Sequence, residues 1–509
     1  MDTPLPTPRE MARWDDLAIR EAGIMGEILM ENASREALRV LCAEGPDLSG
    51  AFALFLAGSG NNGGDAFALA RHASDLGAKC LVLHTRGLKE YKGETLYHSR
   101  LCTGCGVETA RLGAQEEADL PQPDIVVDGL LGTGFSGELR KDYLDWIRWI
   151  NRLGEKAFVL SLDIPSGMNG ETGRVGSDAV RADSTVTFGA CKQGLFFPEA
   201  REYTGELHIA PIGIPGWIRE RNPPALFGLN EEVFRHFPRP RPSMHKGRAG
   251  HVLIIGGSPG LTGAPALAGL GALHSGAGLV TIAAPADICG QVRQGWPEIM
   301  SIPLQPGDAW CEDSFSELKK HLPRFDAVVL GPGLGRDKGA IDLVRTYLRQ
   351  TCLTTVFDAD ALFALSQDRN LINNLSRDDV LTPHPGEMAR LLQTGTETIQ
   401  SERIESARSA SRETGCSIVL KGAGSVVSHP ELSDRISPFA SANLAVGGSG
   451  DILAGIIGSL IARGVPSFEA ACLGVYWHGK TGDSLGATFP FRGNLARDIA
   501  CELPRTINL

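Results

Sequence analysis

The sequence lacks a surplus of basic residues, a long apolar run and a leader-like start. Its formal net charge is −11, whereas nucleic acid or an anionic membrane surface requires a basic face on its protein partner. The longest apolar stretch, residues 452–462, is bounded by Asp451 and Arg463 and is too short to cross a bilayer. Residues 1–10 show no basic segment followed by an apolar core. We therefore predict no signal peptide, no nucleic-acid partner and no membrane partner.

A disulfide framework is absent as well. The eleven cysteines are an odd number without regular spacing, which favours reduced thiols in a cytoplasmic protein. Cys102 and Cys105 form one Cys-x-x-Cys motif. Because no second pair of cysteines lies nearby, a zinc site is disfavoured. A redox-active pair is only slightly less disfavoured. The chain has 509 residues, 42% hydrophobic and 21% charged, which is typical of a globular protein with two or more domains.

In the first half of the chain, short β-rich runs alternate with helical patterns. Helical periodicity covers residues 11–40. The strand candidates are residues 52–57, 80–84, 124–128, 158–162 and 185–188. This alternation predicts an α/β domain with a mainly parallel sheet, whose ligands bind at the carboxyl ends of the strands.

Three of these strand ends carry polar clusters. They are residues 58–65 (GSGNNGGD), 128–138 (DGLLGTGFSGE) and 163–167 (DIPSG). The first fits neither a Walker loop nor a dinucleotide fingerprint, yet its amides and bare N–H groups suit a phosphate or an ion. A lone aspartate at a strand end is usually a cap. We expect the three ends to face one crevice, where oxygens of Asn62, Asp128 and Ser166 can encircle a hard cation.

Prolines mark a connector near the middle of the chain. They occupy positions 223, 224, 238, 240 and 242, and proline stiffens the chain and removes hydrogen-bond donors. We therefore place a linker around residues 222–242, outside any sheet interior, with residues 225–237 free to pack on either side. The predicted domains are residues 1–224 and 225–509.

The second half repeats the alternation of strands and helices. Its strand candidates are residues 251–255, 326–330, 354–357, 380–382 and 418–420. Their carboxyl ends lead into glycine-rich turns and into four charged or titratable residues, Asp358, Asp360, His384 and Lys421. Taken singly, these residues are helix caps, a satisfied loop histidine and a solvated lysine. Together at one sheet edge they indicate a crevice for a nucleotide and for phosphoryl transfer.

Residues 446–451 (VGGSGD) give the sharpest functional signal. They precede an apolar helical segment, and glycines before a helix let an anion approach the N–H groups at the positive end of the helix dipole. Asp451 lies at that end, where a carboxylate can take a proton from a hydroxyl as phosphate reaches it. A plain helix cap is an equal alternative on these residues alone. The small-residue helix at residues 263–269 predicts either close helix packing or close approach to a ligand.

Several segments of the first half match a known family. They are residues 61–65, Asp128 with residues 132–138, residues 163–167 and residues 187–195. Through them, residues 10–220 resemble the NAD(P)H-hydrate epimerase domain of the YjeF N-terminal type. The resemblance implies a Rossmann-like, three-layer α/β/α domain in which Asn62, Asp128 and Ser166 hold a potassium ion.

The same resemblance implies a set of residues around the hydrated nicotinamide nucleotide. These are Asn61, Asn62, Gly63, Gly64, Asp65, Gly132, Thr133, Gly134, Phe135, Ser136, Gly137, Glu138 and Asp163. Asp163 is the candidate acid–base group. The family also has a catalytic lysine. Its position in this sequence is ambiguous in the region around Arg86 and Lys89.

The second half matches a second family through residues 246–253, 331–335, 382–387, 419–424 and 447–451. It resembles the ribokinase-like α/β/α fold and, more closely, the ADP/ATP-dependent NAD(P)H-hydrate dehydratase. The resemblance implies that Asp451 is catalytic and binds the substrate together with Ala264, Gly333 and His384. It implies that the nucleotide, with magnesium on its phosphates, is held by Lys421, Gly422, Ala423, Gly424, Ser425 and Gly450.

In this order, the two halves resemble the bifunctional enzymes of nicotinamide nucleotide repair. The resemblance implies interconversion of the R and S forms of hydrated NADH and NADPH (NADHX and NADPHX). It also implies dehydration of the S form at the expense of ADP, giving AMP and phosphate. Of the two nucleotides, we choose ADP over ATP, and we expect a homo-oligomer. The alternative is a ribokinase-like small-molecule kinase with a non-catalytic N-terminal binding module.

Overall fold

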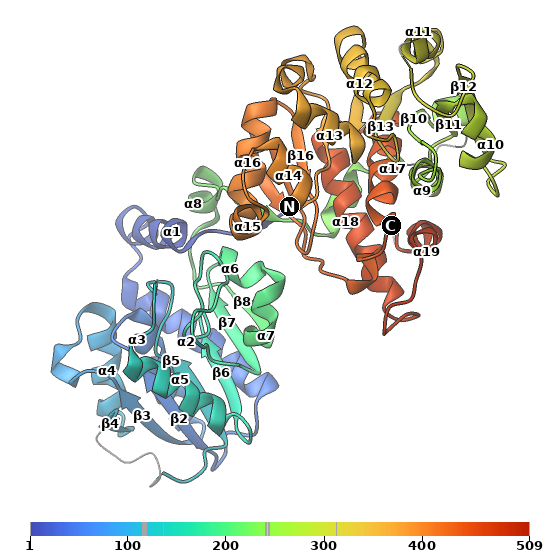
Figure 1. Cartoon of the computed structure of the whole chain (residues 1–509). Helices are drawn as coiled ribbons and strands as arrows, with labels where there is room; N and C mark the ends of the chain where they lie inside the picture. Colours follow the sequence, from blue (N-terminus) through green and yellow to red (C-terminus); the bar gives the residue numbers. More distant parts are fainter. Residues whose placement is uncertain are drawn as a thin grey trace. The chain divides into compact units, whose positions relative to one another are not determined.

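The computed structural model of the chain describes residues 2–113, 120–135, 137–239, 242, 245–311 and 313–507. The chain divides into two compact units (Figure 1). The N-terminal unit is Pro4–Leu226, and the C-terminal unit is Phe227–Leu509 together with the first residues up to Thr3. The predicted boundary at 224–225 lies two residues before this division.

The N-terminal unit is built on a seven-stranded sheet in which every neighbouring pair is parallel. The order across the sheet is β4-β3-β2-β5-β6-β7-β8. The strands are β2 (Phe52–Ala57), β3 (Lys79–His84), β4 (Glu108–Arg111), β5 (Ile125–Gly129), β6 (Phe158–Leu162), β7 (Ser184–Phe188) and β8 (Glu206–Ala210). All five predicted strands are confirmed. The two that the sequence did not predict, β4 and β8, are the edge strands.

Helices cover both faces of this sheet. They are α1 (Pro8–Arg20), α2 (Gly26–Glu44), α3 (Asn61–Asp75), α4 (Gly93–Gly104), α5 (Lys141–Leu153), α6 (Gln193–Phe196), α7 (Arg201–Thr204) and α8 (Gly216–Arg221), with short 3₁₀ turns at Leu88–Glu90 and Pro198–Ala200. Side chains alternate along a strand: Phe55 of β2 packs with α2 and α3, while Leu54 and Leu56 pack with α5. The predicted three-layer architecture is therefore confirmed.

The helical pattern at residues 11–40 is two helices, not one. It breaks between α1 and α2, where Gly23 has a φ of +71°. Helix α1 begins with a capping box in which Thr7 and Glu10 bond each other's backbone N–H groups.

The C-terminal unit is built on an eleven-stranded mixed sheet. The order is β1-β9-β18-β17-β16-β15-β14-β13-β10-β11-β12. The strands are β1 (Thr3–Pro4), β9 (Leu226–Gly228), β10 (His251–Ile255), β11 (Leu279–Pro285), β12 (Ile299–Leu304), β13 (Ala327–Leu330), β14 (Thr355–Phe357), β15 (Val380–Leu381), β16 (Ser417–Leu420), β17 (Val426–His429) and β18 (Leu432–Ile436). Neighbouring strands are parallel along the run β16-β15-β14-β13-β10-β11-β12. The pairs β16–β17 and β17–β18 are antiparallel. The five predicted strands are confirmed.

The expectation that the connector stays outside a sheet interior is wrong at one point. Strand β9 lies second from the sheet edge. The segment after it packs on the C-terminal unit, because Val233 and Phe234 of the 3₁₀ helix Glu231–His236 belong to the core of that unit. A short apolar segment between prolines thus has enough side-chain area to join a core.

The helices of the C-terminal unit also form two layers. They are α9 (Gly263–His274), α10 (Cys289–Val292), α11 (Asp313–Lys319), α12 (Lys338–Gln350), α13 (Asp360–Gln367), α14 (Pro385–Leu391), α15 (Thr396–Ser401), α16 (Arg403–Thr414), α17 (Ser449–Ala462), α18 (Ser467–Leu485) and α19 (Ala496–Glu502), with 3₁₀ turns at Lys246–Arg248, Ala286–Ile288, Leu322–Arg324, Arg369–Asn374, Ala442–Leu444 and Leu503–Arg505. Helices α9, α17, α18 and α19 share one core with alternate residues of the sheet. Helix α16 packs on β16 and β17 (Figure 1).

Small residues let α9 and α17 approach each other closely. A Cβ placed on Gly271 of α9 would lie 2.3 Å from the carbonyl oxygen of Ile452. A Cβ on Gly455 of α17 would lie 2.0 Å from that of Ala268. Of the two alternatives for the small-residue helix, close helix packing is thus present in the structure.

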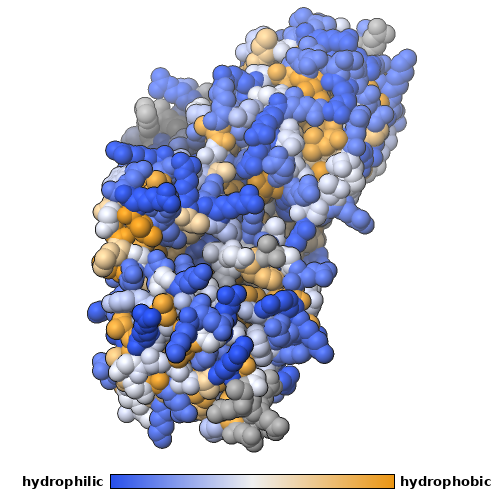
Figure 2. Space-filling view, turned by 90° about the vertical axis from the view of Figure 1, so that its left-hand side faces the viewer, coloured by the Kyte–Doolittle hydropathy of each residue, from blue (hydrophilic) through white to orange (hydrophobic). Residues whose placement is uncertain are grey.

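Among the parallel strands, the strand order reverses between β2 and β5 in one sheet and between β10 and β13 in the other. Ligands of open α/β sheets bind at such switch points, beyond the carboxyl ends of the strands. The face drawn in Figure 2 is mostly hydrophilic, with apolar residues in separate patches. Within the described residues, none of the helices has the length and apolar character that a bilayer-spanning segment needs.

Candidate active sites

A cavity of about 670 Å³ lies at the switch point of the N-terminal unit. The three polar strand ends that we expected to face one crevice all contribute to its wall, so this expectation is confirmed. The predicted ligand residues that line it are Asn61, Asn62, Asp65, Gly132, Thr133, Gly134, Phe135, Glu138 and Asp163.

Other predicted residues have a different place. Residues 61–65 are the first residues of α3 and not a turn before it. A Cβ on Gly63 would lie 2.1 Å from Gly58 O, and one on Gly64 would lie 2.6 Å from Met30 Sδ. These two glycines therefore serve close packing behind the wall. Gly137 has a φ of +89°, and Ser136 lies outside the described residues.

Asn62, Asp128 and Ser166 come together beneath this cavity. The buried carboxylate of Asp128 accepts hydrogen bonds from Ser166 Oγ at 2.6 Å and from Ser166 N at 2.8 Å. The amide nitrogen of Asn62 donates to Leu131 O at 2.8 Å. Burial raises the pKa of Asp128, against the hydrogen bonds from Ser166.

These three residues fit a cation. Within the described residues, the buried Oδ1 of Asn62 has no hydrogen-bond partner. A buried oxygen acceptor left without a donor suits a hard cation. The donor set contains one carboxylate, which suits a monovalent ion such as potassium better than a divalent one.

Asp163 and Lys192 form a buried ion pair at the cavity wall. Lys192, 1% exposed, donates to Asp163 Oδ1, to Phe188 O at 2.6 Å and to Thr187 Oγ1 at 3.1 Å. Asp163 has a φ of 63°, a conformation that costs backbone strain outside glycine. The sequence did not single out Lys192. Of the two basic residues that it left open, Arg86 lines a separate neighbouring pocket.

Two more aspartates line the same cavity, Asp15 and Asp65, together with Glu94 and Glu138. Burial, opposed by Lys192 and reinforced by Asp163, raises the pKa of Asp15 to about 6. Burial and Asp163 also raise the pKa of Asp65 well above its ordinary value. Three carboxyl groups thus surround one ammonium group, and the excess negative charge favours retention of protons.

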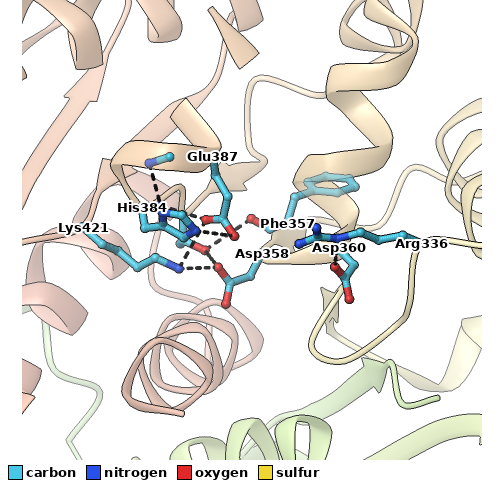
Figure 3. A network of polar contacts seen from close by, with 9 residues as sticks. Arg336, Phe357, Asp358, Asp360, His384, Glu387 and Lys421 are labelled. Carbon is cyan, nitrogen blue, oxygen red and sulfur yellow. Dashed lines mark hydrogen bonds and ion pairs between the residues drawn. The ribbon is translucent and has the colours of Figure 1, made fainter. Parts of the chain in front are cut away.

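The C-terminal unit concentrates charge at the carboxyl ends of β14, β15 and β16 (Figure 3). Lys421 Nζ donates to Asp358 Oδ1 at 2.6 Å and lies 3.9 Å from Glu387 Oε2. Thr382 Oγ1 donates to the same Asp358 oxygen at 2.8 Å. Burial lowers the pKa of Lys421, but Asp358 and Glu387 outweigh it and raise the pKa above its usual value. Lys421 is therefore a fixed cation and not a solvated surface charge.

Asp451 lies in the first turn of α17, partly buried. Burial, and then the charge of Asp358, raise the pKa of Asp451 to about 8, while Lys421 opposes them. A Cβ on Gly450 would lie 3.2 Å from Lys421 Nζ, and one on Gly447 would meet no atom within 4 Å. A Cβ on Gly448 would lie 2.3 Å from Leu267 Cδ1. The turn is thus open at Gly447 and covered at Gly448, with an ammonium group facing Gly450.

The two aspartates after β14 have different surroundings. Asp358 faces Lys421, whereas Asp360 accepts from Gly335 N at 3.0 Å and from Arg336 Nε at 2.8 Å (Figure 3). Asp360 therefore fixes the glycine-rich turn that follows β13.

The predicted substrate residues His384, Gly333 and Ala264 occupy two places. His384 caps α14, with Nδ1 accepting from Gly386 N at 3.0 Å and Nε2 lying 3.4 Å from Glu387 Oε1. Burial and Lys421 lower its pKa, so the ring is neutral at pH 7. Burial also raises the pKa of Glu387, to about 7. A Cβ on Gly333 would lie 3.3 Å from Ala264 Cβ, so these two residues are neighbours.

Residues 421–425 form the loop of a hairpin between β16 and β17. One guanidinium nitrogen of Arg403, from α16, donates to Leu420 O and Lys421 O at 3.3 Å and to Gly424 O at 3.4 Å. Ser425 Oγ donates to Gly422 O at 3.0 Å, while Ala423 is exposed. Arg403, which the sequence did not single out, thus organises the predicted nucleotide loop.

Comparison with known proteins identifies both units. Residues 26–194 match the model described as YjeF-related protein N-terminus, and residues 252–505 match NAD(P)H-hydrate dehydratase. An ADP/ATP-dependent NAD(P)H-hydrate dehydratase of Bacillus subtilis, co-crystallised with ATP and Mg²⁺, is 27% identical. Its structure covers 54% of this chain and 95% of its own, with a TM-score of 0.46.

Two full-length relatives carry the same name, bifunctional NAD(P)H-hydrate repair enzyme. The one from Moorella thermoacetica is 37% identical over 98% of this chain and 96% of its own length. The one from Escherichia coli is 34% identical over 99% and 95%, respectively. The chain therefore belongs to the family of bifunctional NAD(P)H-hydrate repair enzymes and joins an NAD(P)H-hydrate epimerase to an NAD(P)H-hydrate dehydratase.

Proposed function

We propose that Asp451 is the base that prepares the hydroxyl of the hydrate for phosphoryl transfer from ADP. Its carboxylate removes the hydroxyl proton, the oxygen attacks the terminal phosphorus of ADP, and AMP leaves. Phosphorylation makes a poor leaving group into a good one. The C–O bond then breaks, phosphate leaves as the lone pair of the ring nitrogen forms a C=N bond, and loss of a proton from the neighbouring ring carbon restores the double bond of the reduced nicotinamide. A base whose pKa lies near the working pH suits such a transfer.

The transferring phosphate is stabilised by the turn before α17. Backbone N–H groups of residues 448–450 and the positive end of the helix supply an anion hole. The ammonium group of Lys421 faces the same turn, held there by Asp358. Residues 422–425 hold the rest of the nucleotide, and magnesium neutralises charge on its phosphates when bound. Ala264, Gly333 and His384 contact the hydrate.

In the N-terminal unit, the cavity takes the hydrated nicotinamide nucleotide, and Asp163 exchanges protons at the hydrated carbon. Lys192 holds Asp163 in its strained conformation through the ion pair. Asn62, Asp128 and Ser166 would hold potassium, which supplies positive charge beneath the substrate when bound. The unpartnered Oδ1 of Asn62 supports this assignment.

The observation that carries the dehydratase proposal is the position of Asp451 beside Lys421 at a glycine turn that is open at Gly447. The test uses hydrated NADH with magnesium and either ADP or ATP, and follows the return of reduced-nicotinamide absorbance. We expect ADP to support recovery better, with AMP and phosphate as products. Asp451→Asn should abolish recovery while R and S epimers, separated by chiral chromatography, still interconvert. Full recovery with this variant, or accumulation of a stable phosphorylated product, contradicts the proposal.

A further inference from the structure

Epimerisation requires more proton-handling groups than Asp163 alone provides. The hydroxyls of the R and S forms lie on opposite faces of the reduced ring, so a group on one face cannot serve both. Beside Asp163, the titratable side chains that line the cavity of the N-terminal unit include those of Asp15, Asp65, Glu94, Glu138, Tyr143 and Lys192.

Lys192 is not available for proton exchange. An ammonium group has three N–H donors, and Lys192 directs them to the carboxylate of Asp163, the hydroxyl of Thr187 and the carbonyl of Phe188. Its buried position closes it to water. Lys192 therefore positions Asp163, and the second group has to be another side chain of the cavity.

Asp15 meets the requirements for that group. It reaches the cavity from α1, whereas Asp163 reaches it from the end of β6. Within the described residues, its buried Oδ1 has no hydrogen-bond partner. Burial raises the pKa of Asp15 to about 6, opposed by the charge of Lys192 and reinforced by that of Asp163. The carboxyl group of Asp65 is coupled to that of Asp15 as well. Asp15 can therefore be an acid or a base near neutral pH.

We propose that Asp15 is a catalytic residue of the epimerase, acting on one face of the hydrated ring while Asp163 acts on the other. The proposal rests on the function assigned above to this cavity. Asp15 gives its proton to the hydroxyl, the C–O bond breaks with its electron pair on oxygen, and water leaves while the ring nitrogen forms a C=N bond. A water molecule then adds to the other face, its proton passes to the carboxylate of Asp163, and the electron pair returns to nitrogen. The reverse reaction uses the same groups in exchanged roles.

Asp15→Asn is the decisive variant, with Asp16→Asn as its matched control. Asp16 is the next residue of the same helix, exposed and paired with Arg20 at 2.7 Å. Epimer interconversion is followed by chiral chromatography, after subtraction of the uncatalysed rate. We expect kcat to fall about 10²–10⁴-fold in Asp15→Asn, with KM nearly unchanged. Asp16→Asn should keep the wild-type rate, and Asp15→Glu should recover part of it.

Two further readouts separate chemistry from structure. The pH profile of the wild type should contain a limb near pH 6 that Asp15→Asn lacks. In ¹⁸O-labelled water, each epimerisation should place one solvent oxygen on the product. The circular dichroism spectrum of the variant should match that of the wild type, which shows that the N-terminal unit is folded, and dehydration of the S form by the C-terminal unit should be unchanged.

Three results would overturn the proposal: wild-type kcat in Asp15→Asn, an unchanged pH limb, or no ¹⁸O uptake. Absence of epimerisation in the wild type would instead contradict the function assigned to the cavity.

Discussion

Replacing Asp451 by asparagine should stabilise the C-terminal unit while it removes the catalytic base. Burial and the charge of Asp358 raise the pKa of Asp451 from 3.8 to about 8. The folded chain therefore retains a proton that the unfolded chain releases between these two values, and stability falls as pH rises through this window. The contribution is fully present below about pH 4 and is lost above about pH 8. Asparagine carries no charge, so the stability of the variant does not fall in this way as the pH rises.

The magnitude follows from the size of the shift. One pKa unit corresponds to about 1.4 kcal/mol, so a shift of about four units sets an upper bound of about 6 kcal/mol above pH 8. Partial exposure of the carboxyl to solvent screens its charge, and we reduce the expected gain to about 2–3 kcal/mol. For a unit of this size such a gain raises the unfolding midpoint by about 5–10 °C.

Calorimetry at pH 5 and pH 9 measures this effect, since it resolves the transitions of the two units. The matched control is Asp313→Asn, which removes an exposed carboxylate from the first turn of α11 and so loses the same favourable interaction with a helix dipole. We expect Asp451→Asn to gain stability at pH 9 relative to pH 5, and Asp313→Asn to show no such gain. If the two variants respond equally to pH, Asp451 is not a desolvated carboxyl and the argument for its basicity fails.

Three other perturbations have defined outcomes. Lys421→Met removes the cation that lowers the pKa of Asp451, so the pH profile of dehydration should move to higher pH and KM for ADP should rise, as measured by initial rates. Asn62→Leu removes the unpartnered oxygen, so epimerisation should no longer respond when potassium replaces a large organic cation in the assay buffer. Gly455→Ala forces a Cβ to within 2.0 Å of Ala268 O and should cost about 1–3 kcal/mol in chemical denaturation.

The central strands of both sheets could be predicted because their residues are apolar on both faces. The segment Ile125–Gly129, for example, is buried throughout, as expected for a strand covered by helices on both sides. The edge strands β4 (Glu108–Arg111) and β8 (Glu206–Ala210) carry polar, exposed residues. Such segments look like loops, and only pairing with a neighbour makes them strands.

The candidate sites could be predicted from the sequence where glycines precede a helix or follow a strand. Gly447 and Gly448 precede a helix, and this pattern indicates an anion site at the helix N-terminus, where Asp451 lies. Lys192 and Asp15 gave no comparable signal, because sequence does not show whether a charged side chain is buried. Lys192 is buried because the fold places three acceptors around it, and Asp15 enters the cavity because Met11, Trp14 and Ala18 anchor α1 in the core of the N-terminal unit.

Both proposed sites place carboxyl groups beside a lysine, but the two reactions require different proton chemistry from them. An epimerase has to restore the hydroxyl that it removes, so its proton donor and acceptor must be interchangeable, and carboxyls around Lys192 provide such a pair. A dehydratase must commit the oxygen to phosphate, which needs one strong base. Lys421 cannot fully neutralise Asp451, because Asp358 already holds its ammonium group. Asp451 thus keeps a proton affinity well above that of an ordinary carboxylate, and the burial that costs the fold stability is what makes this carboxyl basic enough to take a proton from an alcohol.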